Sequence, residues 1–148
     1  MECVIDNKDA LSDRYFQVIS GSWGENAGPS DTWDPSDPNR TYHWARTTSG
    51  AETARAEWAC TSLPAGQYDV FARWPTLPYA MGNTVAYEVH HAGGVTTVRV
   101  NQNQNTGQWN SLGVYSFNAG SHVVQIHNGQ SAPSWVVCAD AIKFSPAP

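Results

Sequence analysis

The chain has 148 residues, a length that suits one domain and lets a chain bury roughly two thirds of the surface it exposes when unfolded. Lysine and arginine number 8 against 13 aspartate and glutamate residues, which gives a net charge of −5 without any basic cluster. Because phosphate-rich partners require clustered positive charge, this composition argues against nucleic acid and anionic membrane as partners. No segment approaches the length of about eighteen apolar residues that a membrane-spanning helix needs.

Short segments of alternating apolar and polar residues run along the whole chain, separated by clusters of Gly, Pro, Asn and Ser. The pattern predicts strands at 3–6, 15–23, 42–47, 54–60, 67–74, 85–91, 95–101, 112–117, 122–127 and 136–144. About ten short strands with frequent turn signals indicate an all-β, jelly-roll-like β-sandwich of two antiparallel sheets. We assign residues 1–148 to this single domain, and residues 145–148 resemble the start of a linker.

Two neighbouring segments show the alternation most clearly. In residues 54–60 the even positions are apolar, and in residues 67–74 they are Tyr, Val, Ala and Trp. The sequence predicts that these segments are hairpin partners that line the core, with Trp58 and Trp74 as packing residues.

Tryptophan and tyrosine are unusually frequent, with 7 and 6 residues in a chain of which only 14% is charged. A small core cannot hold that many large rings, so some of them are expected at the surface. Trp23, Trp44 and Trp109 lie at the ends of strand patterns, where both core and surface positions stay open.

Cys3, Cys60 and Cys138 all point inward if their strands alternate regularly. Three buried thiols and one disulfide fit this pattern equally, and if a bridge forms we expect it between Cys60 and Cys138. There is neither a CxxC pair nor a Cys/His cluster at metal spacing, so no zinc site is predicted.

Asp140 falls on the same inward face as Cys138, and Asp6 is a similar case on the first strand. Because an isolated buried carboxylate is costly, we expect structural roles for both.

Three connections are long enough to hold a binding site, namely 24–41, 75–84 and 128–135. Each contains an aromatic residue and a polar side chain suited to sugar hydroxyl groups. The candidate carbohydrate-binding residues are Trp33, Tyr79 and Trp135 as platforms, with Asp31, Asn83 and Asn128 as polar partners. A sugar ring presents an apolar C–H face rimmed by hydroxyl groups, which is why such a site needs both kinds of residue. The alternative is that these rings fold back as lids over the core.

Asp31, Asp34 and Asp37 recur at intervals of three in the first of these connections. Their oxygens could together hold a structural calcium ion, although the glycine and bidentate glutamate of an EF-hand are missing. A solvated acidic loop is the alternative, and no other cofactor is predicted.

Motifs for catalysis are weak. The sequence lacks a G-x-S-x-G elbow, an H-E-x-x-H motif and a glycine-rich phosphate loop. His90 and His91 are adjacent on one strand and point to opposite faces, although one of them could converge in space with His43 or His127. We therefore predict that the domain is not an enzyme.

Several short elements match a known family in order and spacing. They are 4–7, 19–23, 56–58, 63–74, 87–94, 98–102, 109–117 and 139–141. Through them the chain resembles the golvesin C-terminal-like domain, also described as the xanthan-lyase carbohydrate-binding-like domain. The resemblance implies an accessory β-sandwich of secreted bacterial polysaccharide lyases, amidases and other extracellular or cell-surface enzymes, with a role in glycan binding. It supplies no catalytic or ligand residues that could be carried over.

The first eight residues contain neither a basic nor an apolar leader region. An intracellular protein and a piece of a longer secreted chain both fit, and the resemblance favours the second. The predicted function is binding of polysaccharide or cell-surface glycan by a non-catalytic accessory module. The alternatives are a structural module that self-associates through exposed aromatic loops, in a fibre, surface layer or particle, and a hydrolase.

Overall fold

The computed structural model describes residues 2–33, 40–130 and 135–148, and within these ranges it contains strands and turns but no helix. The strands are β1 (Cys3–Asp6), β2 (Arg14–Ser20), β3 (Gly24–Ala27), β4 (Thr41–Arg46), β5 (Thr48–Ser49), β6 (Arg55–Leu63), β7 (Gly66–Arg73), β8 (Val85–His91), β9 (Gly94–Val100), β10 (Asn110–Phe117), β11 (Gly120–His127), β12 (Gly129–Gln130), β13 (Val136–Ala139) and β14 (Ala141–Pro146).

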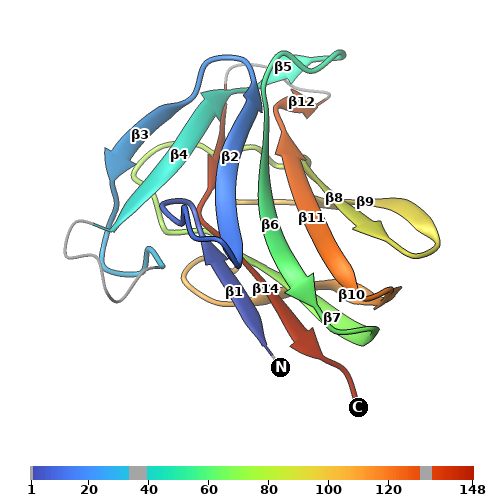
Figure 1. Cartoon of the computed structure of the whole chain (residues 1–148). Coiled ribbons are helices and arrows are strands. Elements are labelled where there is room, and N and C mark those ends of the chain that lie inside the picture. The colour runs from blue at the N-terminus through green and yellow to red at the C-terminus, as the bar shows by residue number, and fades with distance from the viewer. Residues whose placement is uncertain (1, 34–39, 131–134) are drawn as a thin grey trace.

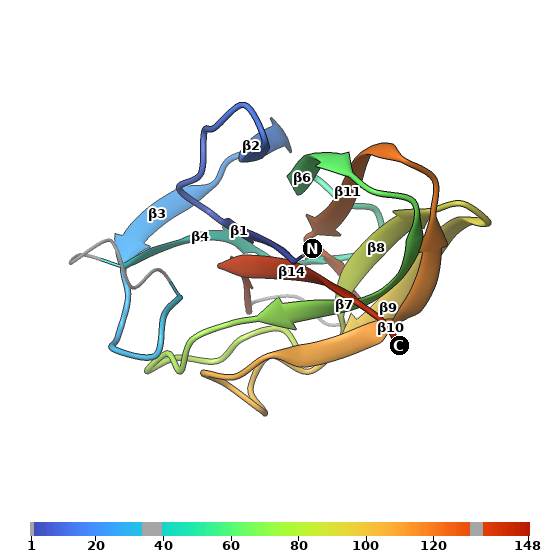
Figure 2. The ribbon, with the colours of Figure 1, turned by 60° about the horizontal axis from the view of Figure 1, so that its bottom comes forward.

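Two larger sheets form the sandwich, as Figures 1 and 2 show. One has the strand order β1-β14-β7-β10, and the other has the order β2-β6-β11-β8-β9. A third, three-stranded sheet of order β13-β4-β3 extends the molecule at one end, and β12 pairs with β5 in parallel. Every strand pair in the four-, five- and three-stranded sheets is antiparallel. The predicted all-β sandwich is therefore confirmed.

The centre of the core is a row of three large rings. Trp58 of β6 and Trp74, which follows β7, lie on either side of Tyr87 of β8, with ring centroids 6.1 and 6.2 Å from that of Tyr87. Trp58 and Trp74 are 0% and 2% exposed, which confirms the prediction that they are packing residues. They come from facing sheets, so their contact with Tyr87 holds the two layers together.

The predicted hairpin of β6 and β7 is wrong. β6 pairs with β2 and β11 in the five-stranded sheet, whereas β7 pairs with β10 and β14 in the four-stranded sheet. The turn at residues 63–66 leads the chain from one layer to the other. Alternation correctly placed Trp58 and Trp74 in the core, although Glu57 and Ala59 on the other face of β6 are buried as well, and it contains no information about the strand on either side.

The strand predicted at 136–144 is divided at Asp140. β13 pairs with β4 of the small sheet, and β14 pairs with β1 and β7 of the four-stranded sheet. Asp140 lies at this change of sheet and is 0% exposed, as the inward alternation predicted. The polar strand β3 and the two-residue strands β5 and β12 lie outside the predicted segments.

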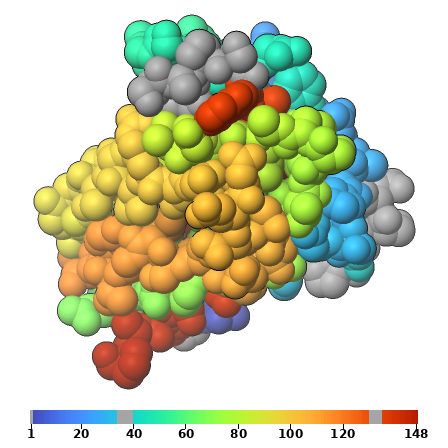
Figure 3. Space-filling model, turned by 180° about the vertical axis from the view of Figure 1, so that it is seen from behind, coloured from blue at the N-terminus to red at the C-terminus, as the bar shows by residue number. Residues whose placement is uncertain are grey.

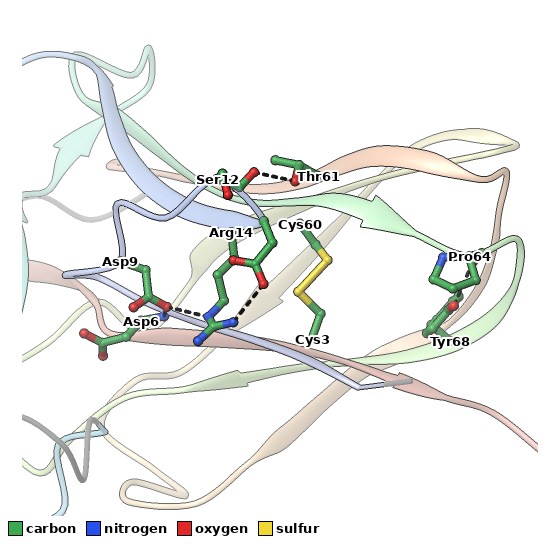
Figure 4. The surroundings of a disulfide bond; sticks show 10 residues. Cys3, Asp6, Asp9, Ser12, Arg14, Cys60, Thr61, Pro64 and Tyr68 are labelled. Atoms are coloured by element: carbon green, nitrogen blue, oxygen red, sulfur yellow. Dashed lines mark hydrogen bonds and ion pairs between the residues drawn. A yellow bond between two sulfur atoms is a disulfide. The ribbon is translucent and has the colours of Figure 1, made fainter.

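The disulfide joins Cys3 to Cys60, with Cα atoms 6.6 Å apart (Figure 4). It connects β1 of the four-stranded sheet with β6 of the five-stranded sheet. The expected pairing of Cys60 with Cys138 is therefore wrong. Cys138 is a free, fully buried thiol on β13, a strand that pairs with β4. All three cysteines do point inward, but inward orientation alone does not determine which of them face each other.

Candidate functional site

A hollow of about 360 Å³ is bordered by the small sheet and by the loop of residues 75–84, and we call it the Tyr79 hollow. It is lined by Asn26, Trp44, Arg46, Tyr79, Ala80 and Val136. Trp44 and Arg46 are two residues apart on β4 and so share a face, and Val136 is the register partner of Arg46 on β13. The hollow therefore combines two large rings with an amide and a guanidinium group.

Tyr79 is held at the rim of this hollow by its own hydroxyl group. That hydroxyl is hydrogen-bonded to the hydroxyl of Tyr42, which is 3% exposed, while Tyr79 itself is 41% exposed. Burial and this hydrogen bond raise the pKa of the Tyr79 phenol above its usual value. One face of the ring is thus open while its tip is anchored.

The loop of residues 75–84, which contains Tyr79, is fixed at several points. The backbone N–H of Met81 donates to Oδ1 of Asn103 at 2.9 Å, and the N–H of Gly82 donates to the carbonyl oxygen of Val136 at 2.8 Å. Gln102 is fully buried and bridges the hydroxyl of Tyr87 and the backbone of Cys138. Figure 3 shows the adjacent loops 75–84 and 101–109 on one face. The rings over the hollow are therefore preorganised.

Trp44 also borders a second hollow of about 550 Å³, which we call the Trp23 hollow. Its lining includes Trp23, Ser22, Thr53 and the backbone of Gly24 beside Trp44. The indole of Trp44 lies directly across Gly24, where any β-carbon would overlap the ring. Trp23 and Trp44, which the sequence left undecided, are thus half-buried rings beside open space.

Trp33 is half-buried and packs against Trp109 rather than against the Tyr79 hollow. The two ring centroids are 5.2 Å apart, and the guanidinium carbon of Arg73 lies 5.4 Å from the centroid of Trp33. The backbone N–H of Trp33 donates to Oδ2 of Asp140 at 2.8 Å, which fixes the loop to the end of β13.

Trp135 lies at the start of β13, with its backbone N–H donating to Oγ1 of Thr47 at 2.9 Å. It is half-buried and directly precedes Val136 of the Tyr79 hollow. Of the three predicted platforms, Tyr79 therefore lines the Tyr79 hollow, Trp135 does not belong to its lining, and Trp33 lies with Trp109 near the end of β7.

The three predicted polar partners differ in their surroundings. Asn128 is 2% exposed, and its amide bonds to the backbone of Thr53, Ala54 and Arg46 and to the hydroxyl of Thr53. That amide therefore has a structural role within the fold. The carboxylate of Asp31 accepts hydrogen bonds from the N–H and hydroxyl of Thr76. Asn83 is exposed in the loop that contains Tyr79.

For the calcium prediction, only Asp31 falls within the described residues, because Asp34 and Asp37 lie outside them. The hydrogen bonds to Thr76 tie Asp31 to the loop that follows β7. The involvement of these three residues in calcium binding stays a prediction.

Asp6 and Asp140, the two carboxylates expected to be structural, are both buried, at 4% and 0% exposure. Asp6 accepts a hydrogen bond from the backbone N–H of Lys8 at 2.9 Å. Burial raises the pKa of Asp140 well above its usual value, and within the described part of the chain its Oδ1 has no hydrogen-bond partner.

Two of the histidines converge on one glutamate on the outer face of the five-stranded sheet. Nε2 of His127 and of His90 lie 3.5 and 3.8 Å from carboxylate oxygens of Glu88. Glu52, Glu88 and His127 bring their ligand atoms within 4.8 Å of one another. Both carboxylates bind the guanidinium group of Arg55, so a cation already lies between them. Burial lowers the pKa of His127.

Comparison with known proteins places this fold in a family. The golvesin C-terminal domain family matches residues 3–146, nearly the whole chain. The chain belongs to the golvesin C-terminal family. The resemblance that the sequence indicated is thereby confirmed.

Relatives of this golvesin-type domain include part of a much larger protein. The xanthan lyase of Bacillus sp. (strain GL1) is 38% identical over 86 residues, which is 56% of this chain and 9% of that protein. The structure of Paenibacillus xanthan lyase matches with a TM-score of 0.81 and 31% identity over 99% of this chain and 13% of that chain. This chain therefore spans about a tenth of the length of these relatives.

A smaller solved structure has the same fold. The family 35 carbohydrate-binding module from Clostridium thermocellum matches with a TM-score of 0.61 and 13% identity, over 97% of this chain and 98% of that chain. At this identity the comparison concerns the fold alone. The described residues contain no helix long and apolar enough to cross a membrane.

Proposed function

We propose that this golvesin-type domain is a non-catalytic accessory module that binds polysaccharide at the Tyr79 hollow. The observation that carries the proposal is the pairing, in one preorganised hollow, of Tyr79 and Trp44 with the polar side chains of Asn26 and Arg46. Aromatic faces pack on the C–H face of a sugar ring, and amide and guanidinium groups donate to its hydroxyl groups.

Support for this proposal also comes from the relatives. Two of them are xanthan lyases, and a carbohydrate-binding module shares the fold. Xanthan is therefore the first ligand to test, and the proposed accessory role implies a location outside the cell, beside a polysaccharide-degrading enzyme. Trp135 and the exposed Asn83 are adjacent in sequence to the loop and strand that line the hollow and stay predicted contacts, whereas Trp33 belongs to a separate aromatic group.

The test is isothermal titration calorimetry of the chain with xanthan and a panel of neutral and acidic polysaccharides, together with tryptophan fluorescence. Tyr79→Ala and Trp44→Ala are expected to weaken binding by about tenfold or more each, because each removes a ring that lines the hollow. His122→Ala, on the far strand β11, serves as the control and is expected to bind normally. Absence of binding to every polysaccharide, or binding that these two variants leave unchanged, would overturn the proposal.

Self-association is a second candidate function, favoured by exposed apolar residues on both edge strands of the five-stranded sheet. Val18 and Ile19 of β2 are 43% and 45% exposed, and Val95 of β9 is 55% exposed. Exposed apolar residues on sheet edges invite pairing with another copy. Light scattering after size-exclusion chromatography tests this candidate, and a monomer at high concentration would count against it.

A further inference from the structure

The outer face of the four-stranded sheet carries a group of rings and cations that is separate from the Tyr79 hollow. We call it the aromatic–cation face and define it as Trp33, Phe71, Arg73, Trp109 and Lys143. Phe71 and Arg73 alternate on β7 with buried residues, and Lys143 alternates on β14 with buried Ile142 and Phe144. Figure 2 shows β14, β7 and β10 side by side, and the start of β10 pairs with the end of β7.

Strand register brings these side chains together. Lys143 is the partner of Phe71, and Arg73 is the partner of Ala141, so both cations lie along the same two strands. Trp109 immediately precedes β10, whose first residue, Asn110, pairs with Ala72 of β7. The loop that contains Trp33 is held there by the bond from Arg73 to the carbonyl oxygen of Asp31, at 3.3 Å.

Both cations lie close to the ring of Trp109. Nζ of Lys143 is 4.6 Å from the centroid of Trp109 and 4.8 Å from that of Phe71. The guanidinium carbon of Arg73 is 5.8 Å from the centroid of Trp109 and 5.4 Å from that of Trp33. Such contacts hold a cation over a ring without neutralising its charge.

No ion pair joins either cation to a carboxylate among the residues that the structure describes, and Arg73 acts at longer range on the buried carboxylate of Asp140. Lys8, Arg14 and Arg55 each form an ion pair within 4.0 Å. Lys143 and Arg73 form no such ion pair with any described residue. The nearest acidic residue along this face of β7 is Asp69, whose carboxylate accepts a hydrogen bond from the hydroxyl of Ser111. In a chain with a net charge of −5, two cations without an ion pair to any described residue thus lie over three rings.

We infer that the aromatic–cation face binds the carboxylate-bearing sugars of an acidic polysaccharide, an inference that rests on the proposed glycan-binding function and deepens it. The half-buried rings of Trp33 and Trp109 supply an apolar surface for a sugar ring, and Lys143 and Arg73 supply positive charge for its carboxylate. This face would make the module prefer a uronate-containing polymer over the same polymer without charge.

The test uses pairs of polymers that differ only in charge: polygalacturonate, polyglucuronate and polymannuronate, each compared with its carboxyl-reduced form. At low salt, the wild-type chain is expected to bind at least one charged polymer about tenfold or more tightly than its reduced form, the magnitude of one charge-assisted hydrogen bond. Lys143→Gln and Arg73→Gln are each expected to remove most of this preference. Lys8→Gln removes an equal charge elsewhere and is expected to keep it.

Thermal unfolding of each variant, followed by circular dichroism, shows whether the variant is folded. Equal binding of charged and reduced polymers, or a preference that Lys143→Gln and Arg73→Gln both leave intact, would overturn the inference while leaving the proposed function standing. If the wild type shows no charge preference and Tyr79→Ala loses all binding, the inference is likewise overturned and the proposed function stands. No binding to any polymer would overturn both. Tighter binding of a single-stranded oligothymidylate than of any uronate polymer would assign the face to nucleic acid instead.

Discussion

The hydroxyl groups of Tyr42 and Tyr79 are hydrogen-bonded to each other, and this contact anchors the loop of residues 75–84 to strand β4. Tyr42 is buried and Tyr79 is exposed, so one end of the contact belongs to the fold and the other to the proposed binding surface. Tyr79→Phe keeps the ring and removes the anchor, and it leaves the buried Tyr42 hydroxyl without this partner. We expect the free energy of unfolding to fall by about 1 kcal/mol and glycan affinity to fall less than in Tyr79→Ala. Urea denaturation and calorimetry measure the two effects, and equal affinities for both variants would show that the ring itself makes no contact.

Gly24 has no β-carbon, and the indole of Trp44, which lines both hollows, occupies the space where one would be. Gly24→Ala places a methyl group where the ring now lies, so the ring must move. We expect altered tryptophan fluorescence and weaker glycan binding, although no side chain that lines the Tyr79 hollow has been removed. Ala27→Ser, on the same strand and exposed, is the control. Unchanged binding in Gly24→Ala would exclude Trp44 from the site.

The disulfide between Cys3 and Cys60 closes a loop with a sequence separation of 57. In the chain-entropy account, the double variant Cys3→Ser/Cys60→Ser should lose about 4 kcal/mol of unfolding free energy. Guanidinium denaturation measures this loss, with Cys138→Ala as a variant that keeps the bridge. A loss below about 1 kcal/mol would show that the bridge does not constrain the unfolded chain.

Cys138 is the thiol left over, and burial raises its pKa well above the usual value. Because the thiolate is the reactive form, an aromatic disulfide reagent is expected to leave the native protein unmodified and to find one thiol per chain after unfolding without reductant. Peptide mapping should then place that thiol at Cys138. A thiol at Cys3, with a peptide linking Cys60 to Cys138, would contradict the structure.

Asp140 makes stability depend on pH, because burial raises its pKa in the folded state. The unfolded carboxyl releases its proton near pH 4 while the folded one retains it. The contribution of the Asp140 carboxyl to the free energy of unfolding is therefore fully present below pH 4. It is lost as the pH rises toward the folded pKa, by up to about 1.4 kcal/mol per pH unit. Asp140→Asn stays neutral, so wild type is expected to lose stability relative to this variant between pH 4 and 7. Chemical denaturation at several pH values tests this, and a gain by wild type would contradict it. Asp13→Asn, which removes an exposed carboxyl, is the control.

Much of the fold could be predicted from local patterns. Alternation identified the buried faces of β6 and β7, and with them Trp58 and Trp74, because a half-buried strand must place apolar residues on every second position. It could not show that these strands belong to different sheets, or that Cys3 faces Cys60. Both facts depend on contacts between residues far apart in the chain, which no local pattern records.

The candidate site was predictable to a similar extent. Tyr79 was identified because it lies in a long connection of a chain with more large rings than a small core can hold, whereas the burial of Asn128 was hidden by its position in a predicted loop. Alternation places Arg73 and Lys143 on the outer face of their strands, but their convergence on Trp109 requires the register of β7 and β14.

The indole N–H signals of the 7 tryptophans, recorded by nuclear magnetic resonance during titration with xanthan oligosaccharides, test the central claim most directly. If the half-buried rings form a glycan-binding surface, the signal of Trp44 should shift, and acidic sugars should also shift those of Trp33 and Trp109. The signals of the core residues Trp58 and Trp74 should stay in place. If no indole signal moves with xanthan or with any other glycan of the panel, or if only the core signals move, the account is contradicted.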